Sequence, residues 1–315
     1  MGVGRSEPFF IVGCGRSGTT MLRLMFNAHP DVAIPPESQF IPTLVAAWPR
    51  MITREGVDAD AIVRSIGRRL DHMGLDRDLV RDRLAVLRDR TPRAATECIF
   101  GLVTEAEGKP RWADKTPRHV EDMPTIAGVF PEARFIHIVR DGRDVALSFF
   151  ERPFGPRNIW DAARHWGRTV GAGVRDAGSL DPERYREVRY ERLIEAPDTV
   201  MKELCDFVGL EPREEMLRYF ERAAARLSDG ERGNHPNVVR PPTKGLRDWR
   251  IDMIQGDVEA FEAVAGPLLS ELGYERRFPR PSRGVAARRF LEMRRRDARA
   301  GRIAVENAFN RRAPR

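Results

Sequence analysis

The chain has 315 residues, 41% of them hydrophobic, and a formal net charge of +7. This length allows one large core, and no apolar stretch approaches the roughly 20 residues that a membrane span needs. The first residues do not have the pattern of a secretory signal, and the three cysteines are too widely spaced for a disulfide framework or a zinc site. We therefore predict a cytoplasmic α/β protein with no transmembrane segment.

The positive charge is concentrated at the C-terminus. Residues 280–315 contain 12 arginines, no lysine and three acidic residues, whereas the rest of the chain is slightly acidic. Charge confined to a terminal arm is weak support for a nucleic-acid-binding domain. We predict an exposed, partly helical C-terminal extension with no nucleic-acid partner. Weak contact of this tail with an anionic surface is the less favoured interpretation.

The first predicted element is a strand that leads through a glycine-rich loop into a helix. The apolar residues 9–12 are followed by Gly13, Gly15 and Gly18. Such glycines let backbone N–H groups converge on an anion at the start of a helix, which indicates a phosphate- or sulfate-binding loop. Gly13 and Gly18 have the spacing of the ATPase and GTPase phosphate loop, but Thr19 stands where that loop carries lysine. Ordinary ATP or GTP chemistry is therefore disfavoured.

The next segments lead to a candidate catalytic carboxylate. The first helix is predicted to end near Asn27, and a short extended segment at residues 32–34 runs into two prolines. Glu37 follows these prolines, just before or at the start of another helix. Residues 58–107 have a charged helical pattern with a turn at residues 74–76, which predicts a helical insertion.

A second strand and loop follow this insertion. Arg111–Lys115 is predicted as a short strand or loop, and Arg134–Val139 as a buried parallel strand because it is almost continuously apolar and β-branched. The polar residues 140–144 follow that strand, and a helix is predicted to begin near Val145. Open α/β sheets bind ligands beyond the carboxyl ends of their strands. The two loops are therefore predicted to face one crevice.

The remaining elements extend this α/β pattern. Tyr185–Arg189 is predicted as a strand, Pro197–Val208 as a helix that ends at Gly209, and residues 214–226 as one further helix. Residues 230–242 are polar and rich in glycine and proline, so they are predicted to form a loop, which residues 243–245 close.

Several segments in the same order resemble one family. The chain is similar to the sulfotransferases that use 3′-phosphoadenosine 5′-phosphosulfate (PAPS), most of all to the tyrosylprotein-sulfotransferase-like and bacterial groups. The segments that carry the resemblance are residues 15–20, 28–32, 114–117, 135–148, 190–193 and 244–246. The resemblance implies a P-loop-type three-layer α/β/α fold with a central, mostly parallel sheet, a helical insertion and a helical C-terminal tail. One domain is expected at residues 1–279, with the insertion at 58–107 and the basic extension at 280–315.

The resemblance also implies which residues bind the donor. The 5′-phosphosulfate is expected on the loop residues Arg16, Ser17, Gly18, Thr19 and Thr20. The 3′-phosphate is expected on Arg140 and Ser148, the adenine near Tyr190, and a closing loop at Lys244 and Gly245. PAPS would be the sulfuryl donor, and no metal is expected.

Glu37 is the predicted general base, because sulfuryl transfer to an alcohol requires removal of the acceptor proton. Lys115 and Arg16 are predicted to stabilise the charge that develops on the leaving phosphate and the sulfonyl oxygens. His119 is a second candidate for the base. Glu37 is also compatible with a purely structural role as an acid near a helix N-terminus.

Other polar residues are predicted to be structural. His29 lies in a turn, and His137 within the apolar strand is expected to be buried and hydrogen-bonded. Cys14 is expected to be a small filler in the loop. Arg143 is interpreted as a surface charge or as the partner of Asp144.

The predicted function is transfer of a sulfuryl group from PAPS to an acceptor hydroxyl. A small metabolite, a glycolipid or a saccharide is preferred as acceptor over a protein tyrosine. Two alternatives stay open: a P-loop nucleotide kinase or other phosphotransferase, and a catalytically inactive nucleotide-binding protein.

Overall fold

The computed structural model describes residues 7–227 and 229–294, and these form two compact units. Of the described residues, the first unit comprises 7–140, 169–227 and 229–246, and the second comprises 141–168 and 247–294. The two units are described separately below. A single domain at residues 1–279 stays a prediction.

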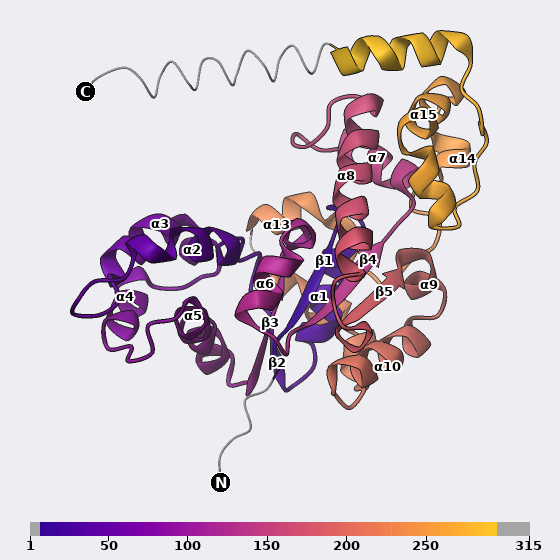
Figure 1. The fold of residues 1–315 in the computed structure, drawn as a ribbon. Helices are drawn as coiled ribbons and strands as arrows, with labels where there is room; N and C mark the ends of the chain where they lie inside the picture. Colours follow the sequence, from indigo (N-terminus) through magenta and orange to yellow (C-terminus); the bar gives the residue numbers. More distant parts are fainter. Residues whose placement is uncertain (1–6, 228, 295–315) are drawn as a thin grey trace, which may run out of the picture. The chain divides into compact units, whose positions relative to one another are not determined.

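A five-stranded sheet lies at the centre of the first unit (Figure 1). Its strand order is β2-β3-β1-β4-β5, and all four pairings between neighbouring strands are parallel. The strands are β1 (Phe9–Gly13), β2 (Val32–Ala33), β3 (Arg111–Lys115), β4 (Arg134–Val139) and β5 (Tyr185–Arg189). These bounds confirm the predicted strands and the parallel sheet.

Both faces of the sheet are covered, as the side chains of β1 show. Phe10 and Val12 belong to one core cluster, and Phe9 and Ile11 belong to the other. Alternate residues of a strand point to opposite faces, so each cluster fills one side of the sheet. The first cluster is completed by α2 (Ile41–Ala47), α3 (Ala59–His72), α4 (Arg77–Ala85), α5 (Pro92–Glu107) and α6 (Met123–Val129). The second is completed by α1 (Thr19–Asn27), α9 (Tyr190–Glu195), α10 (Pro197–Val208), α11 (Glu214–Leu217) and α12 (Phe220–Arg226). The three-layer prediction is confirmed.

The predicted helical insertion consists of α3, α4 and α5. Each helix begins at a residue whose side chain accepts a hydrogen bond from a backbone N–H of the first turn: Asp58, Asp76 and Thr91. Gly74, with φ of 75°, lies in the turn between α3 and α4. The short polar residues and the glycine therefore set the limits of these helices, as the sequence pattern predicted.

Two segments of the first unit differ from the sequence prediction. Residues 214–226 form two helices, α11 and α12, because Tyr219 between them is buried and its hydroxyl donates to the carbonyl oxygen of Arg240 at 3.1 Å. The predicted loop at residues 230–242 contains helix α13 (Asp229–Asn234) and the 3₁₀ turn η4 (Pro236–Val239). The glycine and proline content of this segment did not predict its helical turns correctly. Proline is tolerated in the first turn of a helix, and η4 has its proline at that position.

The second unit contains α7 (Gly142–Phe150), the first part of α8 (Ile159–Ala177), α14 (Trp249–Asp252), α15 (Gln255–Glu271) and a helical stretch at residues 283–294. Helix α7 begins at Gly142 rather than near Val145, because the Asp141 side chain accepts from the N–H of Arg143 at 2.9 Å and caps the helix. A Cβ on Gly142 would lie 2.5 Å from the rings of Trp166 and Phe261, so the backbone approaches these rings closely.

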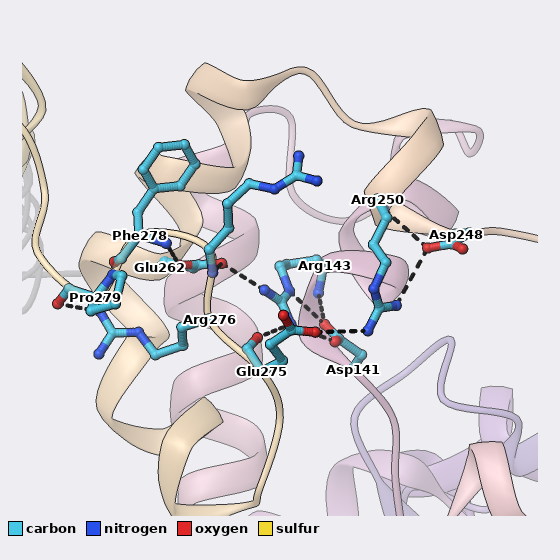
Figure 2. Close-up of polar contacts among 10 residues, drawn as sticks. Asp141, Arg143, Asp248, Arg250, Glu262, Glu275, Arg276, Phe278 and Pro279 are labelled. Carbon is cyan, nitrogen blue, oxygen red and sulfur yellow. Dashed lines mark hydrogen bonds and ion pairs between the residues drawn. The ribbon is translucent and has the colours of Figure 1, made fainter.

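Arg143 is the centre of a buried ion-pair network in the second unit (Figure 2). Its guanidinium donates to Asp141 Oδ2 at 2.7 Å and to Glu262 Oε1 at 2.6 Å, and it stacks over the ring of Trp249. The interpretation of Arg143 as a surface charge or as the partner of Asp144 was therefore wrong. Asp144 instead accepts the backbone N–H of Trp249 at 2.9 Å.

Within the described residues, no helix is both long enough and apolar enough to span a bilayer. The basic C-terminal extension is described only as far as residue 294, so the remainder of the predicted tail lies outside the described residues.

Candidate active site

The loop between β1 and α1 has the conformation of an anion cradle. Arg16 has φ of 72° and Gly18 has φ of 95°, both in the left-handed region. Arg16 is one of only two non-glycine residues with positive φ in the described chain, and such residues cluster at binding sites. The hydroxyl of Ser17 is buried and has no hydrogen-bond partner among the described residues. Together with the free N–H groups at the start of α1, these features fit a bound phosphate or sulfate.

Lys115 and Glu37 form an ion pair beside this loop. Lys115 is the last residue of β3, and its Nζ lies 2.8 Å from Glu37 Oε1 and 3.4 Å from Thr20 Oγ1. The parallel pairing of β1 with β3 places Lys115 opposite Ile11, so the lysine reaches the phosphate loop from the neighbouring strand. The structure therefore brings together three predicted site residues from three separate segments.

Both carboxylate oxygens of Glu37 accept a hydrogen bond. Gln39 Nε2 donates to Oε2 at 3.0 Å, while Lys115 binds Oε1. Burial acts to raise the pKa of Glu37, but the charge and hydrogen bond of Lys115 and the hydrogen bond of Gln39 outweigh it, so the pKa lies below its ordinary value. Glu37 is therefore an ionised carboxylate at neutral pH.

A buried polar chain fixes the segment that carries Glu37. The backbone N–H of Gln39, a residue with φ of 52°, donates to Thr116 Oγ1 at 3.3 Å, and the Thr116 hydroxyl donates to Asp114 Oδ1 at 3.2 Å. Asp114 is fully buried at the end of β3. This chain ties the Glu37 segment to the strand that carries Lys115, which sets the geometry of the ion pair.

Arg140 and Tyr190 lie on the other side of the phosphate loop. The Arg140 guanidinium donates to the carbonyl oxygen of Arg16 at 3.4 Å and lies 4.3 Å from the centre of the Tyr190 ring. Tyr190 packs so closely on Gly18 that a Cβ at Gly18 would lie 2.6 Å from its ring. These contacts connect the ends of β4 and β5 with the loop after β1. A crevice between the two loops stays a prediction.

Three predicted donor residues are not among the contacts described above. Ser148 lies buried in α7, in the second unit. Lys244 is largely exposed and forms an ion pair with Glu195 at 2.5 Å, and Gly245 follows it with φ of 75°. The assignment of these three residues to the donor stays a prediction.

His235 was missed by the sequence prediction. Its Nδ1 lies 3.3 Å from the Arg16 guanidinium, and its Nε2 lies 3.3 Å from Thr20 Oγ1. Arg16 also donates to the carbonyl oxygen of Asn234 at 3.1 Å. No motif marks this residue, and the contact spans more than 200 positions of the chain. Only the fold reveals it.

Three other histidines that the sequence analysis considered, and the loop cysteine, are buried in the structure. His137 contacts the hydroxyl of Tyr185 at 2.6 Å and is buried and hydrogen-bonded, as predicted. His29 is also buried and contacts the carbonyl oxygen of Glu211 at 2.9 Å, which fits its predicted structural role. Cys14 is buried in the loop, which fits a filler. His119, the second candidate for the base, is buried with Nδ1 2.9 Å from Asp114 Oδ2.

Two cavities border the segment that carries Glu37. One, of about 630 Å³, is lined on this segment by Ile34, Pro35 and Pro36. The other, of about 560 Å³, is lined by Gln39 and also by Thr116 and His119. Both volumes are in the range of small-molecule sites. Across the parts of the chain that the structure describes, no group of three or more metal-ligating side chains occurs.

The fold and the site together define a class of α/β proteins. Their phosphate loop lacks the usual lysine, and a lysine from β3, the neighbour of β1 in the sheet, lies beside it instead. A comparison with known protein families agrees with this class. Residues 8–215 match the model of the Sulfotransferase family, and the chain belongs to that family. The predictions of family, fold and sulfotransferase class are confirmed.

Relatives from animals are similar over most of the chain. It is 27% identical to Protein-tyrosine sulfotransferase 1 of Danio rerio, covering 84% of this chain and 72% of the relative. It is 26% identical to a Putative protein-tyrosine sulfotransferase of Caenorhabditis briggsae, and the match covers 89% of this chain and 94% of that relative. The match to Protein-tyrosine sulfotransferase of Drosophila melanogaster has 25% identity and covers 84% of this chain, but it spans only 51% of that relative.

Solved structures are similar in fold. The sulfotransferase domain from the curacin biosynthetic pathway matches with a TM-score of 0.59 and 21% identity, over 85% of this chain and 98% of that domain. The sulfotransferase domain from the Synechococcus PCC 7002 olefin synthase gives the same TM-score with 20% identity, and the match covers 86% of this chain and 97% of that domain.

Proposed function

We propose that the protein transfers a sulfuryl group from PAPS to an acceptor hydroxyl, with Glu37 as general base. The observation that carries the proposal is the contact of Glu37 with Lys115, whose ammonium also reaches Thr20 of the phosphate loop. A base and a cation thereby stand side by side at the edge of an anion cradle. This is the pairing that transfer from an anionic donor to a neutral alcohol requires.

We assign the following roles to the residues of the site. The backbone N–H groups of the loop and of the first turn of α1 bind the 5′ phosphosulfate, and Ser17 offers it a buried hydroxyl. Glu37 removes the acceptor proton as the acceptor oxygen bonds to sulfur and the bond from sulfur to the phosphate oxygen breaks. Lys115 and Arg16 stabilise the negative charge that passes to the departing phosphate. No step requires a metal.

We place the 3′-phosphate of the donor on Arg140 and Ser148, the adenine near Tyr190, and the closing loop at Lys244 and Gly245. Support for Arg140 is its position at the end of β4, where it contacts the phosphate-loop carbonyl of Arg16. An aromatic ring beside a guanidinium offers a flat surface suited to a purine.

We propose that the acceptor enters through the cavity of about 630 Å³ next to Glu37. Its lining combines apolar residues, such as Pro36, Leu75 and Ala225, with charged ones: Arg23, Glu107, Glu221, Arg222 and Arg226. The sequence favoured a small metabolite, glycolipid or saccharide, whereas the relatives are named for protein tyrosine. Both acceptor classes belong in the test. A cytoplasmic location, and weak contact of the C-terminal tail with an anionic surface, stay predictions.

The first experiment measures binding of adenosine 3′,5′-bisphosphate (PAP), followed by incubation with sulfur-labelled PAPS. Tyrosine peptides, phenols and fractionated small-molecule and macromolecular extracts are offered as acceptors. We expect PAP to bind without magnesium and label to reach an acceptor hydroxyl. Failure to bind PAP would overturn the proposal. Magnesium-dependent turnover of ATP would favour the phosphotransferase, and PAP binding without transfer to any acceptor would favour the inactive binding protein.

A cavity-filling pair of variants tests the acceptor route. Ala225 lines the cavity on α12, whereas its exposed neighbour Ala224 does not. We expect Ala225→Trp to raise the KM for the acceptor at least tenfold and to leave PAP affinity unchanged, and we expect Ala224→Trp to change neither. Equal acceptor kinetics in the two variants would exclude this cavity as the route.

A further inference from the structure

His235 occupies a position between two side chains of the phosphate loop region. It follows α13 directly, and its two ring nitrogens contact different partners: Nδ1 contacts Arg16 at 3.3 Å and Nε2 contacts Thr20 at 3.3 Å. The preceding residue, Asn234, accepts a second hydrogen bond from the same guanidinium at 3.1 Å. The end of α13 and the residue after it therefore offer the Arg16 guanidinium two hydrogen-bond acceptors, the Asn234 carbonyl oxygen and His235 Nδ1.

These partners determine the tautomer of the imidazole. A guanidinium only donates hydrogen bonds, so Nδ1 of His235 accepts from Arg16 and carries no proton. The single proton of the neutral ring is then on Nε2, which donates to the oxygen of Thr20. That oxygen also accepts from Lys115 Nζ at 3.4 Å. The hydroxyl hydrogen of Thr20 is thus left to point away from both donors.

The surroundings keep this ring neutral in the free protein. Burial is the main factor that lowers the pKa of His235 to about 3, and the nearby cations Arg16, Lys115 and Arg23 also contribute to this shift. Glu37 acts in the opposite direction and raises this pKa. The groups that face the ring come from the loop after β1, from α1, from β3 and from the segment before α2. Arg16, Lys115 and Arg23 are positive and Glu37 is negative, and Arg23 is in addition paired with Glu231 of α13 at 3.0 Å.

An anion bound in the loop would reverse this balance. Arg16 is proposed to stabilise the donor, and a guanidinium that turns towards a phosphate gives up its contact with Nδ1 of His235. When Arg16 turns, Nδ1 loses its donor, and the negative charge of the phosphate favours the protonated ring. The same change supplies a cation where charge accumulates on the leaving phosphate.

We propose that His235 is a proton-linked donor-site residue. In the free protein its Nδ1 accepts from Arg16; in the nucleotide complex the ring takes a proton from solvent and donates a hydrogen bond to the 5′-phosphate. This inference rests on the proposed function, since it requires PAP or PAPS in the loop.

Two conservative variants separate the two faces of the ring. His235→Asn keeps an acceptor at the position of Nδ1, and His235→Gln keeps a donor at the position of Nε2, but neither side chain titrates near neutrality. His72→Asn, at an exposed position near the end of α3, is the matched control.

The test is calorimetric titration of PAP from pH 6 to pH 8, in pairs of buffers that differ in ionisation enthalpy. Wild type and His72→Asn are expected to take up as much as one proton more per PAP than His235→Asn and His235→Gln. Relative to these two variants, wild-type affinity should rise by up to about tenfold for each pH unit of acidification. Comparison between variants cancels the protonation of PAP itself.

Nitrogen chemical shifts of the His235 ring give a second measurement in wild type, assigned by their loss in His235→Asn. We expect a neutral ring protonated on Nε2 without ligand and a doubly protonated ring with saturating PAP at pH 7. A ring that stays neutral in the complex, or equal proton uptake in wild type and His235→Asn, would overturn the inference. Absence of PAP binding by wild type would instead overturn the proposed function.

Discussion

Replacement of Glu37 by glutamine tests the proposed base directly. The substitution keeps an oxygen that accepts from Lys115 but removes the charge and the ability to take a proton. General-base catalysis contributes about 10²- to 10⁴-fold, so we expect kcat to fall by that factor, equivalent to roughly 3–5 kcal/mol in activation free energy. PAP affinity should not weaken, because the change removes a carboxylate from beside an anion site.

The stability cost of this variant follows from the ion pair. At 2.8 Å, two unit charges attract by about 6 kcal/mol at an effective dielectric constant of ~20, and desolvation offsets much of this. The Lys115 side chain is only 1% exposed, so loss of its counter-charge should lower the free energy of unfolding by about 3 kcal/mol at neutral pH. Since the pKa of Glu37 is depressed, the wild-type advantage is complete above the ordinary carboxyl range and is lost as pH falls through the folded-state value.

The assay compares single-turnover transfer, PAP titration and urea unfolding for wild type and Glu37→Gln. Glu132→Gln is the matched control, because it breaks an ion pair with Arg93 on the same unit but away from the phosphate loop. Its transfer rate should equal that of wild type. If Glu37→Gln binds PAP normally and retains more than a tenth of the wild-type rate, Glu37 is not the base, and His119 becomes the next residue to replace.

Three further predictions concern the loop, the second unit and the sheet. Gly18→Ala should weaken PAP binding at least tenfold in titration without loss of the fold, since its Cβ would displace the Tyr190 ring and its φ of 95° disfavours a side chain; unchanged affinity would contradict the close packing. Arg143→Met should lower the free energy of unfolding by about 3–5 kcal/mol in urea, because it leaves two buried carboxylates without their cation; a cost under about 1 kcal/mol would refute this. His137, whose pKa burial lowers to about 3, should make wild type lose stability as pH falls from about 6.5 towards 3, because the unfolded chain binds the proton and the folded chain does not. His137→Gln, which keeps a polar contact for Tyr185, should flatten that dependence, and an unchanged slope would contradict it.

The sequence predicted those elements of the fold whose pattern lies within a few neighbouring residues, and it missed features that depend on residues far apart in the chain. The strands at Phe9–Gly13 and Arg134–Val139 were predicted correctly because continuous apolar, β-branched runs seldom form anything else between polar loops. The start of α7 was missed because its cap is a single aspartate, Asp141, in a segment crowded with charges. Likewise, the buried state of Arg143 depends on Glu262, more than 100 positions away, which no local pattern encodes.

The same distinction holds for the site. The loop glycines and Glu37 stand in recognisable segments, so their positions could be anticipated. His235 could not, because it reaches Arg16 and Thr20 only through the fold of a stretch whose composition indicates a loop. Long-range contacts of this kind require the register of the sheet and the packing of α12 and α13, and neither is visible in the order of the residues.

The position of Lys115 explains why the missing loop lysine matters. A lysine directly after Gly18 would belong to the phosphate loop alone. Here the ammonium comes from the end of β3, where its Nζ lies 3.4 Å from Thr20 on the donor side and 2.8 Å from Glu37 on the acceptor side. One cation thus contacts both the anion cradle and the proposed base. If the loop binds the donor as proposed, this position of the lysine would link donor binding to the ionised state of Glu37.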